Sequence, residues 1–288
     1  MKKKSVFYLF AILVISIGAI TFLTKPKNLV SPIPKNTPKN LKTVIENALS
    51  GSRGTYSIVV KNLKTKEAYY SKENKIFEPG SLYKIWIMAA VFDQIEKGEL
   101  LEDEMLSQDV SVLNDEFGIS PDGAELTEGT VSLNVKDALE QMIVISHNYA
   151  ALLLSERIKL STVRLFLREH GLSQSNLGDP PETTPLDTAL FFEKLYKGEL
   201  GSRENTDKML ALLKRQQLND GLPKYLPENI EVAHKTGDIG WFKHDAGIVY
   251  TPNGDYAVVI FSESDFPEGA QERIAGISKA VYEYFTKI

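Results

Sequence analysis

The sequence predicts an α/β (α+β) domain, in which terminal helices flank an antiparallel sheet of about five strands and an all-helical lobe is inserted. Segments typical of strands occur towards both ends of the chain, at 55–74 and 230–264. Between them, apolar residues recur at helical spacing. Amphipathic helices are predicted at 41–51 and 267–288. The most economical arrangement builds one sheet from both ends of the chain.

The individual elements follow from local patterns. The two segments within 55–74 are joined by a Lys/Asn/Thr turn, which indicates a hairpin. A helix is predicted from Ser81 to Glu96, and Gly98 ends it. The turn 252–255, Pro-Asn-Gly-Asp, predicts a second hairpin. Five further helices are predicted, at 134–146, 148–158, 161–171, 185–200 and 205–217.

The N-terminus predicts a membrane anchor. Three lysines, Lys2 to Lys4, precede an uncharged apolar run at 6–23, close to the roughly 20 residues that cross a bilayer as a helix. The lysines predict a cytoplasmic N-terminus and an extracytoplasmic body on a single-pass membrane protein. A cleaved signal peptide, which would give a secreted protein, is the alternative, with "SIGA" as a weak cleavage site.

These patterns divide the chain into consecutive parts. A Pro- and Lys-rich linker follows the apolar run and cannot bury a core. The predicted parts are a cytoplasmic tail (1–5), a transmembrane signal-anchor (6–23), the linker (24–40) and a catalytic domain (41–288) with a sheet lobe (41–80 and 228–288) and a helical lobe (81–227).

Composition excludes several classes of function. The formal net charge of −5 argues against a nucleic-acid partner. The absence of cysteine excludes disulfides, thiolate metal sites and a cysteine nucleophile. Four scattered histidines do not suggest a zinc site. We therefore expect no metal and no cofactor, and we expect a monomer.

Ser81 and Lys84 form the first motif that suggests chemistry. At positions i and i+3 of a helix, the hydroxyl and the amine lie on one face, within reach of each other. A serine hydroxyl becomes a good nucleophile when a neighbouring base takes its proton, and a lysine can be that base if its pKa is lowered. The alternative is a helix-capping serine beside a surface lysine.

Two further motifs follow in order. Ser146 and Asn148 interrupt a helical region as Ser-His-Asn, where Asn148 as a helix N-cap is the alternative. Lys235, Thr236 and Gly237 end a predicted strand, where a polar strand end is the alternative. The three motifs thus lie at the start of a helix, in a turn between two helices and at the end of a strand, and each contains polar residues that can take part in catalysis.

With these three motifs, the sequence resembles the penicillin-recognising serine enzymes, and the class A β-lactamases most closely. The resemblance covers residues 41–288 and includes "EPGSLYK", "DPPETTPLDTA" and "VAHKTG". It implies that Ser81 is acylated, with Lys84 as its base. It further implies that Ser146 relays a proton to the leaving nitrogen beside Lys235, and that Asn148 positions Lys84 and the substrate.

The same resemblance implies the substrate contacts. Lys235 and Thr236 would bind the substrate carboxylate by charge-assisted hydrogen bonds. The backbone N–H groups of Ser81 and Asp238 would form the oxyanion hole, next to Gly237.

Departures from the family pattern bear on function. Class A β-lactamases carry a Glu-x-x-Leu-Asn box whose glutamate activates the deacylating water, and this box is missing. Glu169 and Glu182 are weak candidates for its role. His147 replaces the aspartate of the middle motif, and we expect it to pack or cap. The family's carboxylate-binding arginine is not evident, so Lys243 or His244 would stand in, or Lys235 would act alone.

Three functions remain open at this stage. The first is a serine β-lactamase that hydrolyses the β-lactam amide, with slow deacylation because the glutamate box is missing. The second is a D,D-peptidase that acts on the D-Ala-D-Ala stem peptides of peptidoglycan. The third is a penicillin-binding sensor domain without turnover.

Overall fold

The computed structural model of the chain describes residues 40–287. The predicted tail, the predicted membrane helix and all of the linker except Asn40 lie outside this range. Among the described helices, none combines the length and the apolar character needed to cross a bilayer.

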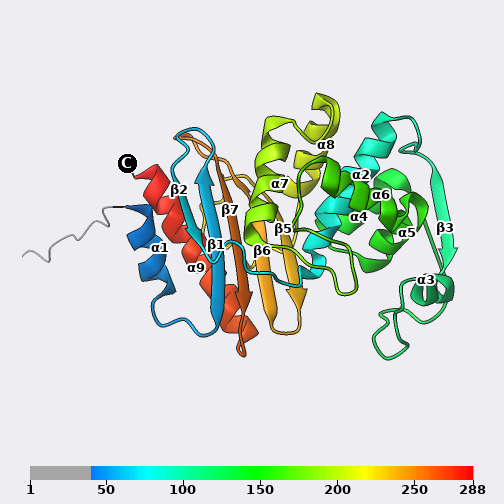
Figure 1. Cartoon of the computed structure of the whole chain (residues 1–288), viewed down its shortest axis with the longest axis horizontal. Coiled ribbons are helices and arrows are strands. Elements are labelled where there is room, and N and C mark those ends of the chain that lie inside the picture. The colour runs from blue at the N-terminus through cyan, green and yellow to red at the C-terminus, as the bar shows by residue number, and fades with distance from the viewer. Residues whose placement is uncertain (1–39, 288) are drawn as a thin grey trace, which may run out of the picture. The chain divides into compact units, whose positions relative to one another are not determined.

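A five-stranded antiparallel sheet forms the framework, as predicted (Figure 1). The first strand pairs along its whole length with the last, from Thr55 opposite Glu263 to Asn62 opposite Tyr256. Strands from both ends of the chain therefore share one sheet. In spatial order the strands are β2 (Ala68–Ser71), β1 (Thr55–Asn62), β7 (Tyr256–Glu263), β6 (Phe242–Val249) and β5 (Val232–Ile239).

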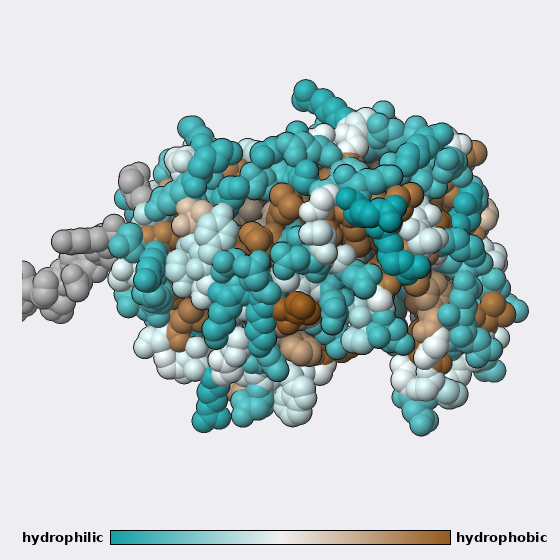
Figure 2. Space-filling view, viewed as in Figure 1, coloured by the Kyte–Doolittle hydropathy of each residue, from teal (hydrophilic) through white to brown (hydrophobic). Residues whose placement is uncertain are grey.

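The two faces of the sheet are buried by different layers. Helices α1 (Leu41–Leu49) and α9 (Pro267–Thr286) lie side by side on one face, where Ile58 and Val60 contact them (Figure 1). Val59, between these two residues, points to the core on the other face, as the alternation of side chains in a strand requires. The polar and apolar residues on the face shown in Figure 2 are intermingled.

The helical part surrounds α2 (Lys84–Glu96). Every residue from Lys84 to Phe92 is buried, which is typical of a helix that is apolar on all sides and packed within a core. The 3₁₀ turn η1 (Gly80–Tyr83) precedes it, so the helix predicted from Ser81 begins three residues later. The other helices here are α4 (Val135–Val144), α5 (Asn148–Ile158), α6 (Leu160–Glu169), α7 (Pro185–Lys197) and α8 (Arg203–Lys214).

The sequence did not predict a small outlying unit. Strands β3 (Met105–Asp109) and β4 (Thr130–Asn134) pair with each other, and α3 (Val110–Glu116) follows β3. Most residues of the two strands are exposed or half-buried, so they lack the apolar alternation that identifies a strand. This unit lies at the end of the molecule opposite α1 and α9 (Figure 1).

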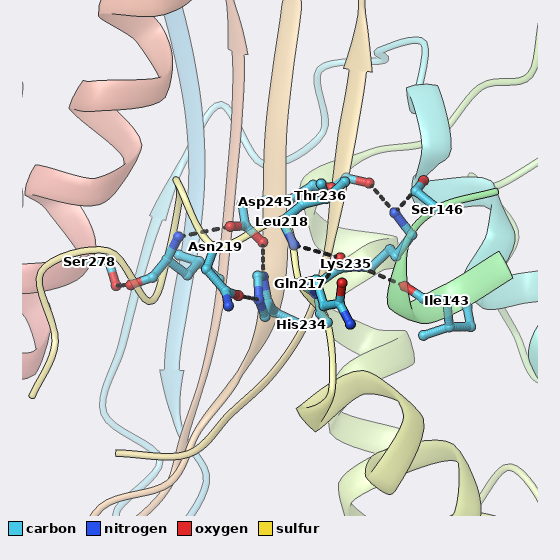
Figure 3. A network of polar contacts seen from close by, with 12 residues as sticks. Ile143, Ser146, Gln217, Leu218, Asn219, His234, Lys235, Thr236, Asp245 and Ser278 are labelled. Carbon is cyan, nitrogen blue, oxygen red and sulfur yellow. Dashed lines mark hydrogen bonds and ion pairs between the residues drawn. The ribbon is translucent and has the colours of Figure 1, made fainter. Parts of the chain in front are cut away.

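A buried polar network holds β5 against the neighbouring strand β6 (Figure 3). The Asp245 carboxylate on β6 is fully buried, accepts the Leu222 backbone N–H at 2.8 Å and pairs with His234 Nδ1 at 2.8 Å. His234 Nε2 lies 3.1 Å from Asn219 Oδ1. The segment that leads into β5 is thereby tied to the strand next to it.

Replacing Asp245 with Ala should destabilise the protein by about 2–4 kcal/mol, because the buried Leu222 N–H and the His234 ring would lose their acceptor. Urea unfolding measures the change. Asp265→Ala is the control, because Asp265 is exposed, and we expect it to change stability by less than about 0.5 kcal/mol. Equal unfolding midpoints for the two variants would contradict this account.

Candidate active site

Ser81 lies where η1 packs closely against the end of β5. Gly80 has φ +50°, and a Cβ on it would lie 2.7 Å from the backbone nitrogen of Asp238. A Cβ on Gly237 would lie 2.2 Å from the Pro79 carbonyl oxygen. Two glycines thus allow the backbone at Ser81 to approach the backbone at Asp238, which a side chain at either position would prevent.

The Lys84 amine is buried beneath the turn between α4 and α5. Its Nζ donates to the Ser146 carbonyl oxygen at 2.5 Å and to Asn148 Oδ1 at 2.5 Å, and lies 3.2 Å from Ser146 Oγ. A neutral amine has two hydrogens and one lone pair. With both hydrogens donated to carbonyl oxygens, the lone pair remains for a hydroxyl proton. Within residues 40–287, no hydrogen bond joins the Ser81 hydroxyl to this amine.

Ser146 lies between two lysines. Lys235 Nζ, also buried, donates to Ser146 Oγ at 2.9 Å and to the Thr236 carbonyl oxygen at 2.9 Å (Figure 3). Ser146 has φ +61°, a left-handed conformation that is strained for a serine. Such strain is concentrated at functional sites, and here it directs both oxygens of Ser146 towards Lys84.

Burial lowers the proton affinity of both lysines. It lowers the pKa of Lys84 to about 8, although the negative charge of Glu125 acts in the opposite direction. Burial lowers the pKa of Lys235 to about 7, assisted by the positive charge of Lys84 and opposed by Asp245. Both amines therefore change charge near neutral pH, as acid–base catalysis requires.

A cleft of about 480 Å³ opens over these residues. Ser81, Asn148 and Asp238 line it, so it brings together one residue from each of the first two motifs and the residue that follows the third. Asn148 Nδ2 donates to Glu125 Oε1 at 2.5 Å. Apolar side chains complete the lining: Phe117, Ile119, Leu152 and Ile239.

The residues after Lys235 occupy alternating faces of the edge strand. Gly237 is buried against η1, while Thr236 is half-buried. The Asp238 side chain is 63% exposed and forms an ion pair with Lys243 on β6, so it points to solvent rather than into the site. Because Lys243 is held by this carboxylate, it is not free to replace the family's arginine.

His244 also does not replace the arginine. It is buried, with Nε2 2.9 Å from the Glu78 carbonyl oxygen, and its Nδ1 accepts the Ser262 N–H at 3.2 Å. Burial lowers its pKa to about 4, so the ring is neutral. It stacks on Phe261 in the core and holds the chain just before Ser81. The suggestion that His244 binds the carboxylate is therefore wrong.

His147 and Asn148 differ from the simplest interpretation of their motif. His147 is the N-cap of α5, and its Nδ1 accepts the Ala150 N–H at 3.1 Å. The expectation that His147 caps is confirmed. Asn148 is not the cap but the first residue of the helix, and its side chain faces Lys84.

The loop between α6 and α7 contributes only Pro181 to the described lining of the cleft. Glu169 is exposed at the end of α6, and its charge acts on Lys97. Glu182 is exposed and pairs through its backbone with Asn176. Neither glutamate is placed to activate water at Ser81.

Two carboxylates of the cleft were missed from the sequence. Glu78 and Glu125 line the cleft, and only the position of Glu78 next to the first motif gave any signal. Glu125 stands in a polar run, "SPDGAELTEG", that looks like an ordinary loop. Among the described residues, no group of three potential His, Asp or Glu ligands is arranged to hold a metal.

Comparison with known proteins decides the family. The model of a family described as "Beta-lactamase enzyme family" matches residues 40–285. The chain belongs to this family. The resemblance to penicillin-recognising serine enzymes, which rested on three motifs, is thereby confirmed.

Individual relatives of this β-lactamase family member are distant in sequence. β-Lactamase BRO-1 of Moraxella catarrhalis is 22% identical over 87% of this chain and 85% of its own. A β-lactamase structure from Sphaerobacter thermophilus matches with a TM-score of 0.76 and 24% identity, over 86% of this chain and 97% of that one. PBP-A matches with a TM-score of 0.77 and 26% identity, over 87% and 97%. A leucine-to-glutamate variant of PBP-A, as an acyl-enzyme with penicillin G, matches at 25% identity.

The close contact of η1 with β5 makes a direct prediction. Gly237→Ala should destabilise the domain by about 1–3 kcal/mol, because the new methyl group overlaps the Pro79 carbonyl. The control is Gly276→Ala in α9, where a Cβ meets nothing within 4 Å and helix propensity favours alanine by about 1 kcal/mol. Thermal unfolding of both variants tests this, and a Gly237→Ala midpoint at or above that of Gly276→Ala would refute it.

Proposed function

We propose that this β-lactamase-like protein is a serine acyl-enzyme that opens the amide of a β-lactam, with Ser81 as nucleophile and slow release of the acyl group. The observation that carries the proposal is the arrangement of Lys84 and Lys235 on either side of the Ser146 hydroxyl. This arrangement suits proton transfer during acylation. The cleft beside it exposes Ser81 to a substrate.

Acylation begins with removal of the Ser81 proton. A rotation of the Ser81 side chain brings its hydroxyl to the lone pair of Lys84, which the two carbonyl acceptors do not use and which the Ser146 hydroxyl, 3.2 Å away, shares. The developing oxyanion lies between the Ser81 and Asp238 N–H groups, which the contact of η1 with β5 brings close. Ser146 then passes its hydroxyl proton to the departing nitrogen and receives from Lys84, 3.2 Å away, the proton that came from Ser81.

Lys235 and Thr236 bind the carboxylate of the substrate. Neither Lys243 nor His244 is available for this role, so Lys235 supplies the positive charge. An anionic substrate near Lys235 favours its protonated form. Substrate binding therefore favours the charged form of Lys235, and this positive charge in turn favours the neutral form of Lys84, which separates the acid from the base.

Deacylation lacks its usual catalyst. The loop between α6 and α7 presents no carboxylate to the cleft within the described residues. Loss of a group of this kind slows a step by about 10² to 10⁴. The acyl-enzyme should therefore form faster than it hydrolyses.

A D,D-peptidase acting on D-Ala-D-Ala stem peptides is the second candidate. The same loop favours it, and so does the match to PBP-A at 26% identity, whose leucine-to-glutamate variant forms an acyl-enzyme with penicillin G. Release of D-alanine from a peptide ending in D-Ala-D-Ala, at a rate above β-lactam turnover, would select the peptidase.

We further propose that residues 6–23 anchor the protein in the cell membrane, with the domain outside the cytoplasm. An extracytoplasmic site would meet both β-lactams and peptidoglycan. Protease protection of the chain in intact cells would oppose this placement.

Ser81→Ala should abolish covalent labelling by benzylpenicillin, because it removes the attacking oxygen, and its unfolding midpoint should stay close to wild type. Mass spectrometry of the intact chain follows the adduct over time. In the wild type, an adduct that clears and leaves opened drug supports the β-lactamase, and one that persists points to the peptidase or a sensor. Labelling of Ser81→Ala would show that the nucleophile is misassigned.

Acylation should rise with pH, because Lys84 acts only when neutral and its pKa is about 8. Below this pKa the neutral fraction grows about tenfold per pH unit, so the acylation rate should do the same between about pH 5 and 7. Lys84→Arg, which stays protonated, should be slow at every pH. A flat profile in the wild type would exclude Lys84 as the base.

A further inference from the structure

We infer that Glu125 is a positioning residue of this active site, which orients the Asn148 amide and acts through it on the Lys84 base. The inference rests on the acylation mechanism proposed above. Glu125 belongs to none of the three motifs and reaches the site from the loop between α3 and β4.

The carboxylate fixes which end of the Asn148 amide faces Lys84. An ionised carboxylate only accepts hydrogen bonds, so the Asn148 NH₂ group must point towards Glu125. The Oδ1 atom then faces Lys84 and accepts from it at 2.5 Å. The reversed amide would place a donor against the donating amine. Glu125 thereby keeps one hydrogen of Lys84 engaged and its lone pair directed to a hydroxyl.

The loop that carries Glu125 is held in place by buried polar groups. The Leu126 N–H donates to the Tyr149 hydroxyl at 3.1 Å, and the Leu126 carbonyl accepts from Asn114 Nδ2 at 2.9 Å. Tyr149 follows Asn148 on α5. The same helix therefore carries the amide and anchors the loop whose carboxylate binds that amide, so the contact is built into the fold.

Charge adds a second effect to this geometry. The groups that face Lys84 are Ser146 from the turn before α5, Asn148 at the start of α5, Lys235 from β5, and Glu125. Glu125 raises the pKa of Lys84 against the larger lowering by burial. It also adds to the effect of burial on Tyr83, whose pKa is raised to about 12. Two groups at the start of α2 thus respond to the same carboxylate.

Glu125 is exposed, so its replacement leaves no buried group without a partner and the variants should fold. Glu125→Gln keeps an oxygen that accepts from Asn148 but removes the charge. Glu125→Ala removes both. Glu128→Gln, an exposed glutamate three residues further along the same segment, is the matched control.

The experiment measures acylation of the full chain by benzylpenicillin between about pH 5.5 and 8.5, by mass spectrometry of the intact protein. In Glu125→Gln and Glu125→Ala, the rising limb of the rate should move to lower pH by about half a unit, because the charge that favours protonated Lys84 is gone. At pH values on the rising limb, below the plateau, Glu125→Gln should therefore be acylated faster than wild type. The plateau should stay within about threefold of wild type for Gln and fall about tenfold for Ala.

The outcomes separate the two proposals. A wild-type chain that is not labelled on Ser81 contradicts the proposed function. If the wild type is labelled, and both Glu125 variants match Glu128→Gln in limb and plateau, only the inference about Glu125 fails. A plateau more than about a hundredfold lower in Glu125→Gln would also overturn it, because Glu125 would then be a reacting group rather than a positioning residue.

Discussion

The structure depends on burying two amines around one serine hydroxyl. A buried ammonium is costly, so the fold surrounds Lys84 and Lys235 with oxygen acceptors and leaves their charge easy to remove. Two of these acceptors come from the turn at Ser146, whose left-handed backbone is itself strained. The apolar surroundings of α2 make this arrangement possible, because every residue from Lys84 to Phe92 lies within the core.

The edge strand β5 holds this arrangement from the other side. Its side chains alternate, so Lys235 points to Ser146 while its neighbour His234 points to the buried Asp245 (Figure 3). A slip of one residue would exchange the two faces, burying the wrong side chain in each environment. The hydrogen bonds of His234 therefore fix the register of β5, and with it the position of the Lys235 amine. At the end of the same strand, Gly237 lets η1 approach.

Local patterns in the sequence predicted much of the fold and the centre of the site. Residues 148–158 form a helix with the predicted bounds, and the three motifs indicated Ser81, Lys84 and Lys235 in advance. The β3–β4 unit and Glu125 were not predicted, because their contacts join distant parts of the chain and have no periodicity. His244 was misjudged for the same reason, since only its partners at Glu78 and Ser262 reveal a neutral core side chain.

The distribution of these contacts explains why acylation and deacylation can separate in this fold. The groups assigned to acylation lie on η1, on α2, on β5 and around the turn that leads into α5, and the hydrogen bonds of Lys84 and Lys235 tie the last three to one another. The loop between α6 and α7 is held by contacts that do not involve the lysines: Ser175 binds Thr183, and the Thr183 backbone pairs with Phe77. A loop built in this way can lose a catalytic carboxylate without disturbing the buried lysines. The acyl-enzyme would then form faster than it is hydrolysed.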